Sequence, residues 1–392
     1  MIQAKVIADS LAPSGDRLTT LEVIMPRYIL AEFNTHRMLS KNSASSRAIP
    51  FNKMVKNVEV NPFIPYAWQK DHKGMQGSDY LTNSDDVKFN ESLWLQARDN
   101  AVEQAIVLND VGGVTKQLCN RLLEPFMYHK VLISATEWEN FFNLRCPKYV
   151  VTELNGKVVT YKSRKEVINF YKANSEYKVH YNYAIGYTDL EWLKLNKGQA
   201  DIHMMFLAEA IYDAMNESTP IKLKEGEWHI PYGDNMELDM LETLLIKANY
   251  GWKSSNQETE GGWLLKGGEE AYYKEIENLK AKISIARCAR LSYQTLGDNP
   301  VIDYEKDLEL YEVLSKSGHW SPFEHVAKVM TGDEYRSNIK GKLNLINDRQ
   351  FQTEFSSKTG YTPLSGACEE KALGWSRNYK GFIQYREYVD ND

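Results

Sequence analysis

The chain has 392 residues, of which 43% are hydrophobic and 26% charged, and it carries a formal net charge of -6 at pH 7. This composition is ordinary for a soluble globular protein with a sizeable core, and the negative balance argues against a general nucleic-acid binder. No apolar run approaches the length of a membrane span, and the start of the sequence has no charged region followed by an apolar stretch. We therefore expect a cytoplasmic protein without a membrane partner.

The first quarter of the chain predicts a hairpin, a helix and a polar loop. Residues 3–9 and 19–26 have the pattern of two strands, and the turn residues at 12–16 join them. The proline that ends the second strand opens a predicted helix as far as Thr35, because proline is well tolerated in a first helical turn. Residues 50–90 are polar and interrupted by prolines and glycines, which predicts an irregular surface excursion or a lid.

Helices predominate in the rest of the chain. Ser134 and Glu137 have the spacing of a capping box, and Asn155-Gly156 between alternating residues predicts a hairpin. Apolar residues of about 199–215 recur at helical spacing. The other expected elements are helices over about 90–108, 118–125, 269–291 and from Asp303 onward, strands over 127–133 and 326–331, and an aromatic-basic helix at 382–388.

The polar loop at residues 36–47 is the most unusual segment. It holds two arginines, a histidine, an asparagine and four serines within twelve positions. Arginine forks and hydroxyl donors on one loop suit a phosphate or another delocalised anion. The alternative is a solvated, capped helix end.

Two further clusters lie near the C-terminal end. Residues 318–325 read Gly-His-Trp-Ser-Pro-Phe-Glu-His and lie between a predicted helix and an apolar strand. This cluster is either a structural end to the helix or part of a functional site. Residues 286–293 place two arginines on a helix of otherwise small residues, which allows close approach of a partner helix or a ligand.

Several common chemistries have no signature in this chain. The sequence lacks a Gly-x-Gly-x-x-Gly after a strand, a Walker loop, a His-Glu-x-x-His and a Gly-x-Ser-x-Gly elbow. Its four cysteines are widely separated, with no Cys-x-x-Cys pair, so we expect a reducing compartment and no metal site. Nucleotide or cofactor binding would need an uncommon scaffold.

Together, the clusters resemble the flavin-dependent thymidylate synthases. The family signature is Arg-His-Arg, seven residues, then Ser-x-Arg; residues 35–37 and 45–47 match it except at the first position. Other family elements are similar to Ala289-Arg290-Leu291-Ser292-Tyr293, to residues 318–325, to Arg121–Pro125, to Asn140–Arg145 and to Gly198–Ile202. In the family the Ser-Pro-Phe-Glu-His element precedes the signature. Here it comes last, so the chain resembles a circular permutation.

The resemblance implies an α+β fold with a mostly antiparallel sheet and packed helices, permuted and with inserts. It divides the chain into a catalytic domain, a Gly-, Ser- and Glu-rich linker, the permuted opening third of the fold and a C-terminal extension. These are residues 1–250 with an insert at 147–197, then 251–268, 269–331 and 332–392.

The implied activity is reductive C5 methylation of dUMP to dTMP. FAD is the implied cofactor, with NADPH and methylenetetrahydrofolate as co-substrates, and the implied assembly is a homo-oligomer, a tetramer in the family. Protein side chains in such an enzyme contribute positioning and electrostatics, while the cofactor carries the redox chemistry.

The resemblance also assigns residues. Ser45, Arg47 and Arg121 would hold the dUMP phosphate, since a dianion needs fixed donors. Arg145 would lie against the uracil and act catalytically, because its permanent charge stabilises anionic character in the ring. Arg121 and Arg145 could instead form helix-end salt bridges, and His325 could be a core histidine. The expected cofactor-binding residues are His36, Arg37, Asn140 and His325.

Departures from the family lie mostly on the flavin side. Thr35 replaces the first arginine of the signature, Ser43 stands where an acidic residue is usual, and Ser134 and Thr136 replace an Asn and an Arg. The phosphate set is better preserved. Three alternatives therefore stay open: hydroxymethylation of a pyrimidine nucleotide, a nucleotide-binding protein that has lost flavin, and an unrelated protein whose loop takes another anion.

Overall fold

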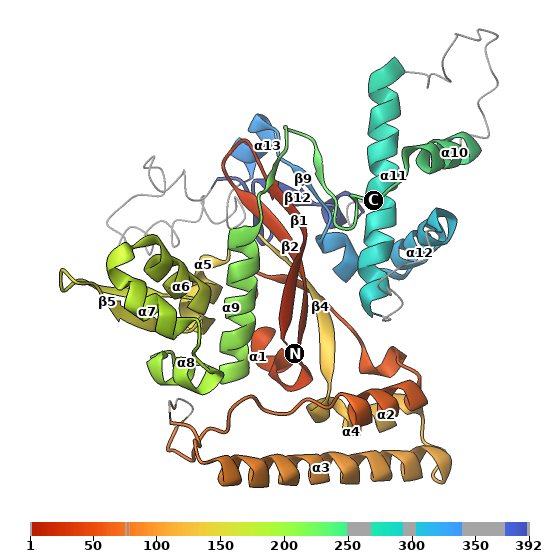
Figure 1. Ribbon diagram of the computed structural model, residues 1–392. Helices are drawn as coiled ribbons and strands as arrows, with labels where there is room; N and C mark the ends of the chain where they lie inside the picture. Colours follow the sequence, from red (N-terminus) through yellow and green to blue (C-terminus); the bar gives the residue numbers. More distant parts are fainter. Residues whose placement is uncertain are drawn as a thin grey trace, which may run out of the picture.

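The computed structural model describes residues 2–74, 77, 79–248, 268–292, 303–338 and 373–389. It is an α+β fold centred on a sheet with strand order β3-β4-β2-β1-β7 (Figure 1). Pairing is antiparallel except between β1 and β7. The bounds of these strands are β1 Gln3–Leu11, β2 Arg17–Pro26, β3 Ser40–Ser43, β4 Tyr128–Ala135 and β7 Ile221–Lys222.

Smaller sheets and helices complete the described part of the chain. One sheet has the order β12-β9-β8, and two pairs are β5-β6 and β10-β11. Their bounds are β5 Tyr149–Thr152, β6 Val158–Tyr161, β8 Trp228–His229, β9 Ala327–Val329, β10 Trp375–Ser376, β11 Tyr379–Lys380 and β12 Phe382–Gln384. The α-helices are α1 Leu30–Phe33, α2 Phe51–Val60, α3 Ser84–Asp110, α4 Lys116–Leu122, α5 Glu139–Arg145, α6 Arg164–Ala173, α7 Lys178–Ala184, α8 Asp189–Leu195, α9 Ile202–Glu217, α10 Leu238–Ala248, α11 Gly268–Ser292, α12 Tyr304–Ser317, α13 Gly332–Ser337 and α16 Arg386–Val389. The 3-10 turns are η1 Arg27–Ile29, η2 Ser46–Ala48, η3 Glu124–Phe126, η4 Ser175–Tyr177 and η5 Ser321–Glu324.

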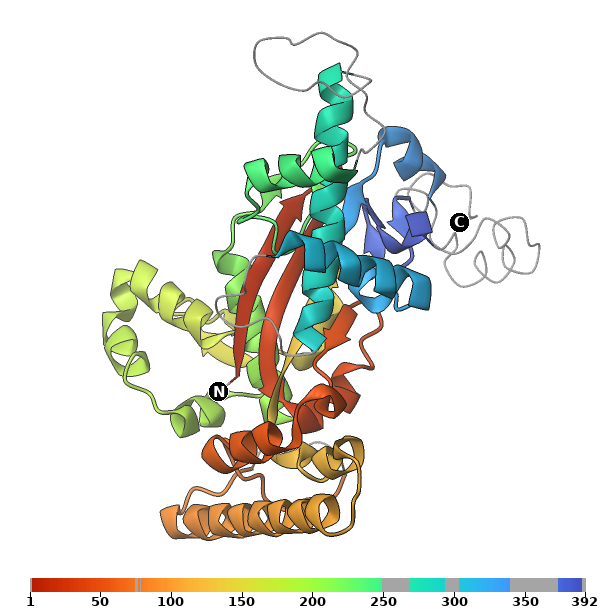
Figure 2. The same cartoon turned by 90° about the vertical axis from the view of Figure 1, so that its right-hand side faces the viewer.

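The central sheet is covered on both faces, by α9 on one and by α11 on the other (Figures 1 and 2). Side chains alternate between faces along a strand. Val131 and Ile133 accordingly pack with α5 and α9, whereas Leu132 between them packs with Cys288 and Leu291 of α11. Helix α11 thus completes the core of the N-terminal sheet. The linker expected at 251–268 lies almost entirely outside the described residues.

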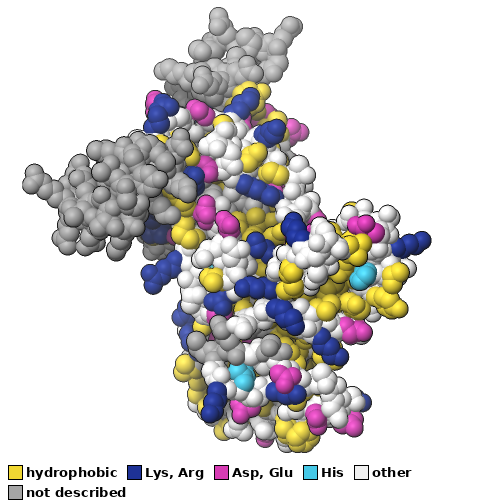
Figure 3. All heavy atoms as spheres, turned by 90° about the vertical axis from the view of Figure 1, so that its left-hand side faces the viewer, with side chains coloured by type: hydrophobic (Ala, Val, Ile, Leu, Met, Phe, Trp, Pro, Cys, Tyr) yellow, Lys and Arg dark blue, Asp and Glu magenta, His cyan; other side chains and the backbone are white. Residues whose placement is uncertain are grey.

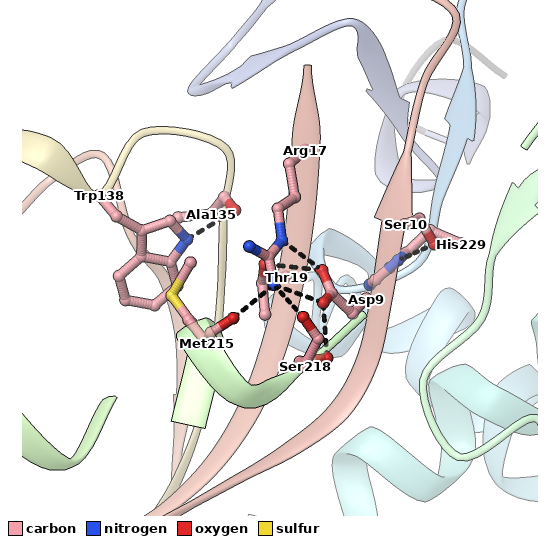
Figure 4. A network of polar contacts seen from close by, with 9 residues as sticks. All are labelled: Asp9, Ser10, Arg17, Thr19, Ala135, Trp138, Met215, Ser218 and His229. Atoms are coloured by element: carbon pink, nitrogen blue, oxygen red, sulfur yellow. Dashed lines mark hydrogen bonds and ion pairs between the residues drawn. The ribbon is translucent and has the colours of Figure 1, made fainter. Parts of the chain in front are cut away.

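An ion-pair network fastens the β1–β2 hairpin to the end of α9 (Figure 4). Arg17 donates to both carboxylate oxygens of Asp9, at 2.8 and 2.6 Å, and to the carbonyl oxygen of Met215 at 2.7 Å. Ser218 also donates to Asp9, at 2.6 Å. Burial tends to raise the pKa of Asp9, but these hydrogen bonds outweigh it and hold that pKa below its usual value. The hairpin predicted from the sequence is confirmed.

The irregular excursion predicted for residues 50–90 is confirmed only for its middle, because the described residues between α2 and α3 form no helix or named strand. Phe51, Met54 and Val58 of α2 are buried in a cluster with α3 and α4, and α3 begins at Ser84. The prolines at 62 and 65 lie between these helices, so the prediction was wrong only at the two ends of the segment. Among the described helices, none has the length and apolar character that crossing a bilayer would need.

The insert at 147–197 forms its own small cluster beside α9. The Asn155-Gly156 hairpin is confirmed as β5–β6, with Gly156 at φ 82°. Arg164 joins the insert to Glu209 of α9, its backbone N–H donating at 2.7 Å. Figure 3 shows hydrophobic side chains gathered on the side where the insert lies. Its most exposed apolar residues include Leu154, Val158, Val179, Tyr183 and Ile185.

Two local predictions were wrong because tertiary pairing decided the structure. Ser134 does not cap a helix: it lies in β4, and α5 begins at Glu139. Residues 382–388 are helical only from Arg386, because Phe382–Gln384 pair with β9 as the edge strand β12. Strand addition to a distant edge leaves no local signal that distinguishes it from a short amphipathic helix.

Candidate functional site

The segment at 36–47 is part turn, part strand. After α1 the chain turns through His36, whose carbonyl oxygen accepts from the backbone N–H of Leu39. Ser40–Ser43 then pair with β4 as the edge strand β3, and Ser45 precedes the η2 turn. Alternation buries Ser40 and Asn42 and leaves Lys41 and Ser43 half-buried.

A buried asparagine ties the end of this segment to α4. Asn120 Nδ2 donates to the carbonyl oxygens of Ser46, at 2.7 Å, and Ile49, at 3.0 Å. Helix α4 packs against η2 as a result, so Arg47 and Arg121 lie on neighbouring elements. Ser46 donates to Glu124, which also pairs with Arg27 at 3.5 Å.

The phosphate donors expected on these two elements are not used by the protein. Arg47 and Arg121 are exposed, and Ser45 is half-buried. Within the described ranges, neither guanidinium forms an ion pair or hydrogen bond, and the hydroxyl of Ser45 has no partner. Free guanidinium groups and a free hydroxyl on elements in contact are suitable donors for a dianion.

Arg145, by contrast, is held by other protein groups. Its Nε donates to His36 Nε2 at 2.9 Å, and its guanidinium pairs with Glu32. The His36 ring also packs edge-on against Phe141, with the ring centroids 4.9 Å apart. Burial, then the positive charges of Arg145 and Lys41, lower the pKa of His36 to about 4. The residue expected at the uracil and a residue expected at the flavin are thus bonded to each other.

Lys41 stabilises the turn at residues 33–39 through its side chain. Its Nζ donates to the carbonyl oxygens of His36, at 2.6 Å, and Phe33, at 3.3 Å. Burial lowers the pKa of Lys41 to about 8. This lysine was not among the residues expected from the sequence, because backbone capping by a lysine depends on the turn geometry.

His325 lies at the end of a buried polar chain on the α11 side of the sheet. Its Nδ1 is 2.8 Å from Ser134 Oγ, and Ser134 Oγ is 2.6 Å from Thr20 Oγ1. Thr20 in turn lies 2.7 Å from His229 Nε2, and His229 Nδ1 lies 2.8 Å from Ser10 Oγ. All five side chains are buried. Burial, then His229, lowers the pKa of His325 to about 3, and its Nε2 has no partner among the described residues.

The remaining expected cofactor residues lie at the surface. Arg37 follows His36 in the turn, and Asn140 is in the first turn of α5; both are exposed. The structure therefore brings the elements of Arg47 and Arg121 into contact, and it places His36 next to Arg145. His325 is hydrogen-bonded to Ser134 of β4 instead. Sequence reasoning missed Asn120, whose only signal was its place next to Arg121.

The arginines of residues 286–293 serve packing. Arg290 Nε donates to Asp307 of α12 at 2.7 Å, and Arg287 Nη1 donates to the carbonyl oxygen of Tyr232 at 2.8 Å. The small residues were expected to allow close approach of either a partner helix or a ligand. In the structure, helix α11 packs closely against helix α12 and against strands β3 and β4. Tyr293 lies outside the described residues. No group of three or more potential metal ligands occurs in the part of the chain that the structure describes.

No family model and no curated protein matches this chain. Among solved structures it is similar to the UMP/dUMP methylase PolB from Streptomyces cacaoi. The form bound with 5-Br dUMP is 12% identical, with a TM-score of 0.36, and covers 55% of this chain and 90% of its own. The form bound with 5-Br UMP is 16% identical, with a TM-score of 0.30, and covers 37% and 76%. These values are too low to assign the function of either neighbour to this chain.

Proposed function

We propose that this chain binds the 5′-phosphate of a pyrimidine deoxynucleotide, dUMP, and modifies C5 of its base, as flavin-dependent thymidylate synthases do. The observation that carries the proposal is that Arg47 on η2 and Arg121 on α4 are exposed and have no partner among the described residues. Asn120 ties these two elements together. A phosphate dianion would satisfy both guanidinium groups and the hydroxyl of Ser45.

Arg145 would act at the base in this proposal. Its guanidinium carries a permanent charge, and Glu32 and His36 fix its orientation. A fixed positive charge stabilises the negative charge that a pyrimidine ring must carry for its C5 to attack a one-carbon electrophile. The ion pair with Glu32 reduces this stabilisation. When substrate binds, Arg145 would therefore have to leave Glu32 or contact Glu32 and the base at the same time.

FAD, NADPH and methylenetetrahydrofolate belong to the proposal through the resemblance alone. Arg37 and Asn140 are exposed and could meet a flavin. Ser134 and Thr136, which the resemblance also places at the flavin, do not fit a flavin. The Ser134 hydroxyl is hydrogen-bonded to Thr20 and His325, and Thr136 Oγ1 accepts from the backbone N–H of Lys380 at 2.9 Å. For that reason the proposed chemistry includes no step through flavin. The same observation favours, as a second candidate, a nucleotide-binding protein that has lost flavin.

Titration calorimetry tests the binding step. We expect dUMP to bind at least tenfold more tightly than deoxyuridine, since loss of the phosphate removes charge-assisted hydrogen bonds, each of about 1.5–3 kcal/mol. Equal affinity for the two would remove the assigned phosphate site.

A tritium-release assay separates the two candidates. An enzyme that modifies C5 releases tritium from C5-labelled dUMP when folate donor, NADPH and FAD are supplied. Tight dUMP binding without any release favours the binding protein. Release without dTMP formation favours a different C5 modification such as hydroxymethylation.

A further inference from the structure

The insert at 147–197 exposes apolar side chains that the proposed nucleotide site does not use. Val179 and Tyr183 are spaced by four residues on α7, so they share one side of that helix, and both are more than half exposed. The hairpin tip is tied to the start of α7, because the backbone N–H of Leu154 donates to the Tyr177 hydroxyl at 2.7 Å. We call the exposed residues of this region the insert face: Leu154, Lys157, Lys178, Val179 and Tyr183.

Helix α3 exposes a second apolar surface, a stripe along one of its sides. The stripe consists of two pairs of residues spaced by four, and the second pair begins fourteen residues after the first ends, close to four helical turns. These residues are Phe89, Leu93, Val107 and Val111, and all are exposed. Glu103 and Asp110 are exposed as well and adjoin Val107 at a distance of one turn. We call these six residues the α3 face.

The two faces belong to elements of opposite charge. Residues 147–197 include nine lysines and arginines against five aspartates and glutamates, although the whole chain has a net charge of -6. Helix α3 has the reverse bias, with six acidic residues and two basic ones. Complementary charge orients two partners, and like charges in contact disfavour binding. An apolar surface with a basic rim therefore fits an apolar surface with an acidic rim.

One chain does not bring its own two faces together. Both ribbon views show α3 along the bottom of the molecule, while the hairpin and α7 project to the side (Figures 1 and 2). Two α3 faces in contact would place acidic rims against each other, and two insert faces would do the same with basic rims. Charge therefore disfavours a symmetric pairing of either face with itself.

We propose that the insert face of one chain binds the α3 face of a second copy, head to tail. Such a contact leaves one free face at each end, so copies add one after another or close into a ring. Helix α3 has 27 residues and presents a strip of roughly 400 Å², about 40 Å long and 10 Å wide. A standard stable interface buries roughly 800 Å² per partner. We therefore expect a weak association that depends on protein concentration, and it does not depend on the proposed nucleotide site.

Sedimentation velocity on the full chain, over a range of concentrations, tests the proposal. The insert-face variant Val179→Gln, Tyr183→Gln and the α3-face variant Val107→Gln, Val111→Gln each remove exposed apolar side chains and leave the core intact. Each variant alone should associate at least about tenfold more weakly than the unmodified chain, since it loses apolar area from the contact. Added salt should weaken association of the unmodified chain, because it screens the charged rims.

An equal mixture of the two variants is the sharpest measurement. Each variant keeps the face that the other has lost, so one intact contact can form between them. The mixture should regain association but stop at two chains, which only a head-to-tail contact predicts. The control variant Ile246→Gln, Val313→Gln replaces two exposed aliphatic residues on α10 and α12 and should associate like the unmodified chain.

Four results would overturn the proposal. The unmodified chain could stay monomeric at every concentration, or one face variant could associate normally, which would mean that a different surface is used. The mixture could fail to form a two-chain species. Association could also disappear after nuclease treatment, which would show that the basic insert binds nucleic acid instead of a second copy.

Discussion

Arg145 Nε donates a hydrogen bond to His36 Nε2 at 2.9 Å, which requires a neutral imidazole with its proton on Nδ1. Burial is the main reason that the pKa of His36 falls to about 4, and the charge of Arg145 is the second. Arg145→Gln should therefore raise the pKa of His36, without restoring its ordinary value of 6.5. An NMR titration of the imidazole signals measures this shift. Arg47→Gln serves as the control and should leave the His36 pKa unchanged; an unshifted pKa in Arg145→Gln would contradict the contact.

Arg47 and Arg121 make separate contributions to phosphate binding in the proposed site. Arg47→Ala and Arg121→Ala should each weaken dUMP binding by roughly 1.5–3 kcal/mol, about tenfold to a hundredfold, since each removes a charged donor. Affinity for deoxyuridine should stay the same. Arg336→Ala is the comparison, because Arg336 is an exposed arginine whose ion pair is with Asp333 on the same short helix. Unchanged dUMP affinity in both site variants would rule out the arginine pair as the phosphate site.

Asn120 should matter for both stability and binding. Its side chain is fully buried and satisfies two carbonyl groups of the η2 region. Asn120→Ala leaves the Ile49 carbonyl without its side-chain donor and the Ser46 carbonyl with only the backbone N–H of Ile49, at 3.3 Å. We expect a cost of about 1–3 kcal/mol in the free energy of unfolding. Because η2 loses its tie to α4, dUMP affinity should fall even though Arg47 and Arg121 are intact. Urea denaturation and calorimetry measure the two effects. A destabilised variant with full dUMP affinity would show that Asn120 is structural only.

The phosphate donors remain a prediction, but their availability agrees with it. The polar segment at 36–47 is a local feature, and the resemblance assigned Ser45 and Arg47 to phosphate; both residues lack a partner among the described residues. The bond between Arg145 and His36 joins residues 109 positions apart, and Glu32, which completes it, belongs to no motif. Asn378 contacts Ser40, which lies 338 positions away in the sequence. The nearby residues 382–384 were predicted as helix from local periodicity, but they pair with β9 as a strand. Spacing along the chain predicts which residues are candidates for a site, whereas packing determines which of them lack a partner within the protein.

Buried histidines should make the fold sensitive to acid. The pKa values of His129, His229 and His325 are each lowered to about 3, chiefly by burial, from 6.5. Between these values the unfolded chain binds more protons than the folded one. Stability is then fully present above about pH 6.5 and is lost as the pH falls toward 3. Glu209 acts in the opposite sense, because burial raises its pKa to about 7 and it loses stabilisation as the pH rises from 4.5.

His129 offers the cleanest test of this pH dependence, since neither ring nitrogen has a partner in the described part of the structure. His129→Leu should reduce the slope of unfolding free energy against pH, between pH 6.5 and 4, by up to about 1.4 kcal/mol per pH unit. Urea midpoints at several pH values give the slope. The exposed His180→Leu is the control and should keep the original slope. A slope that does not change in His129→Leu would mean that this histidine titrates normally in the folded chain.

Thr20 joins the two histidines of the buried polar chain, because its hydroxyl lies within 2.7 Å of both Ser134 Oγ and His229 Nε2. Thr20→Val keeps the shape of the side chain and removes that hydroxyl, so both neighbours lose a partner inside the protein. We expect a loss of about 1–3 kcal/mol in the free energy of unfolding. The ¹⁵N shifts of the His229 and His325 rings should change as well, since Ser134 no longer has a fixed direction for its proton. Thr20→Ser keeps the hydroxyl and loses only a methyl group, so it should retain the native ring shifts. If Thr20→Val and Thr20→Ser give the same stability and the same ring shifts, the five side chains are close neighbours without forming one connected hydrogen-bond chain.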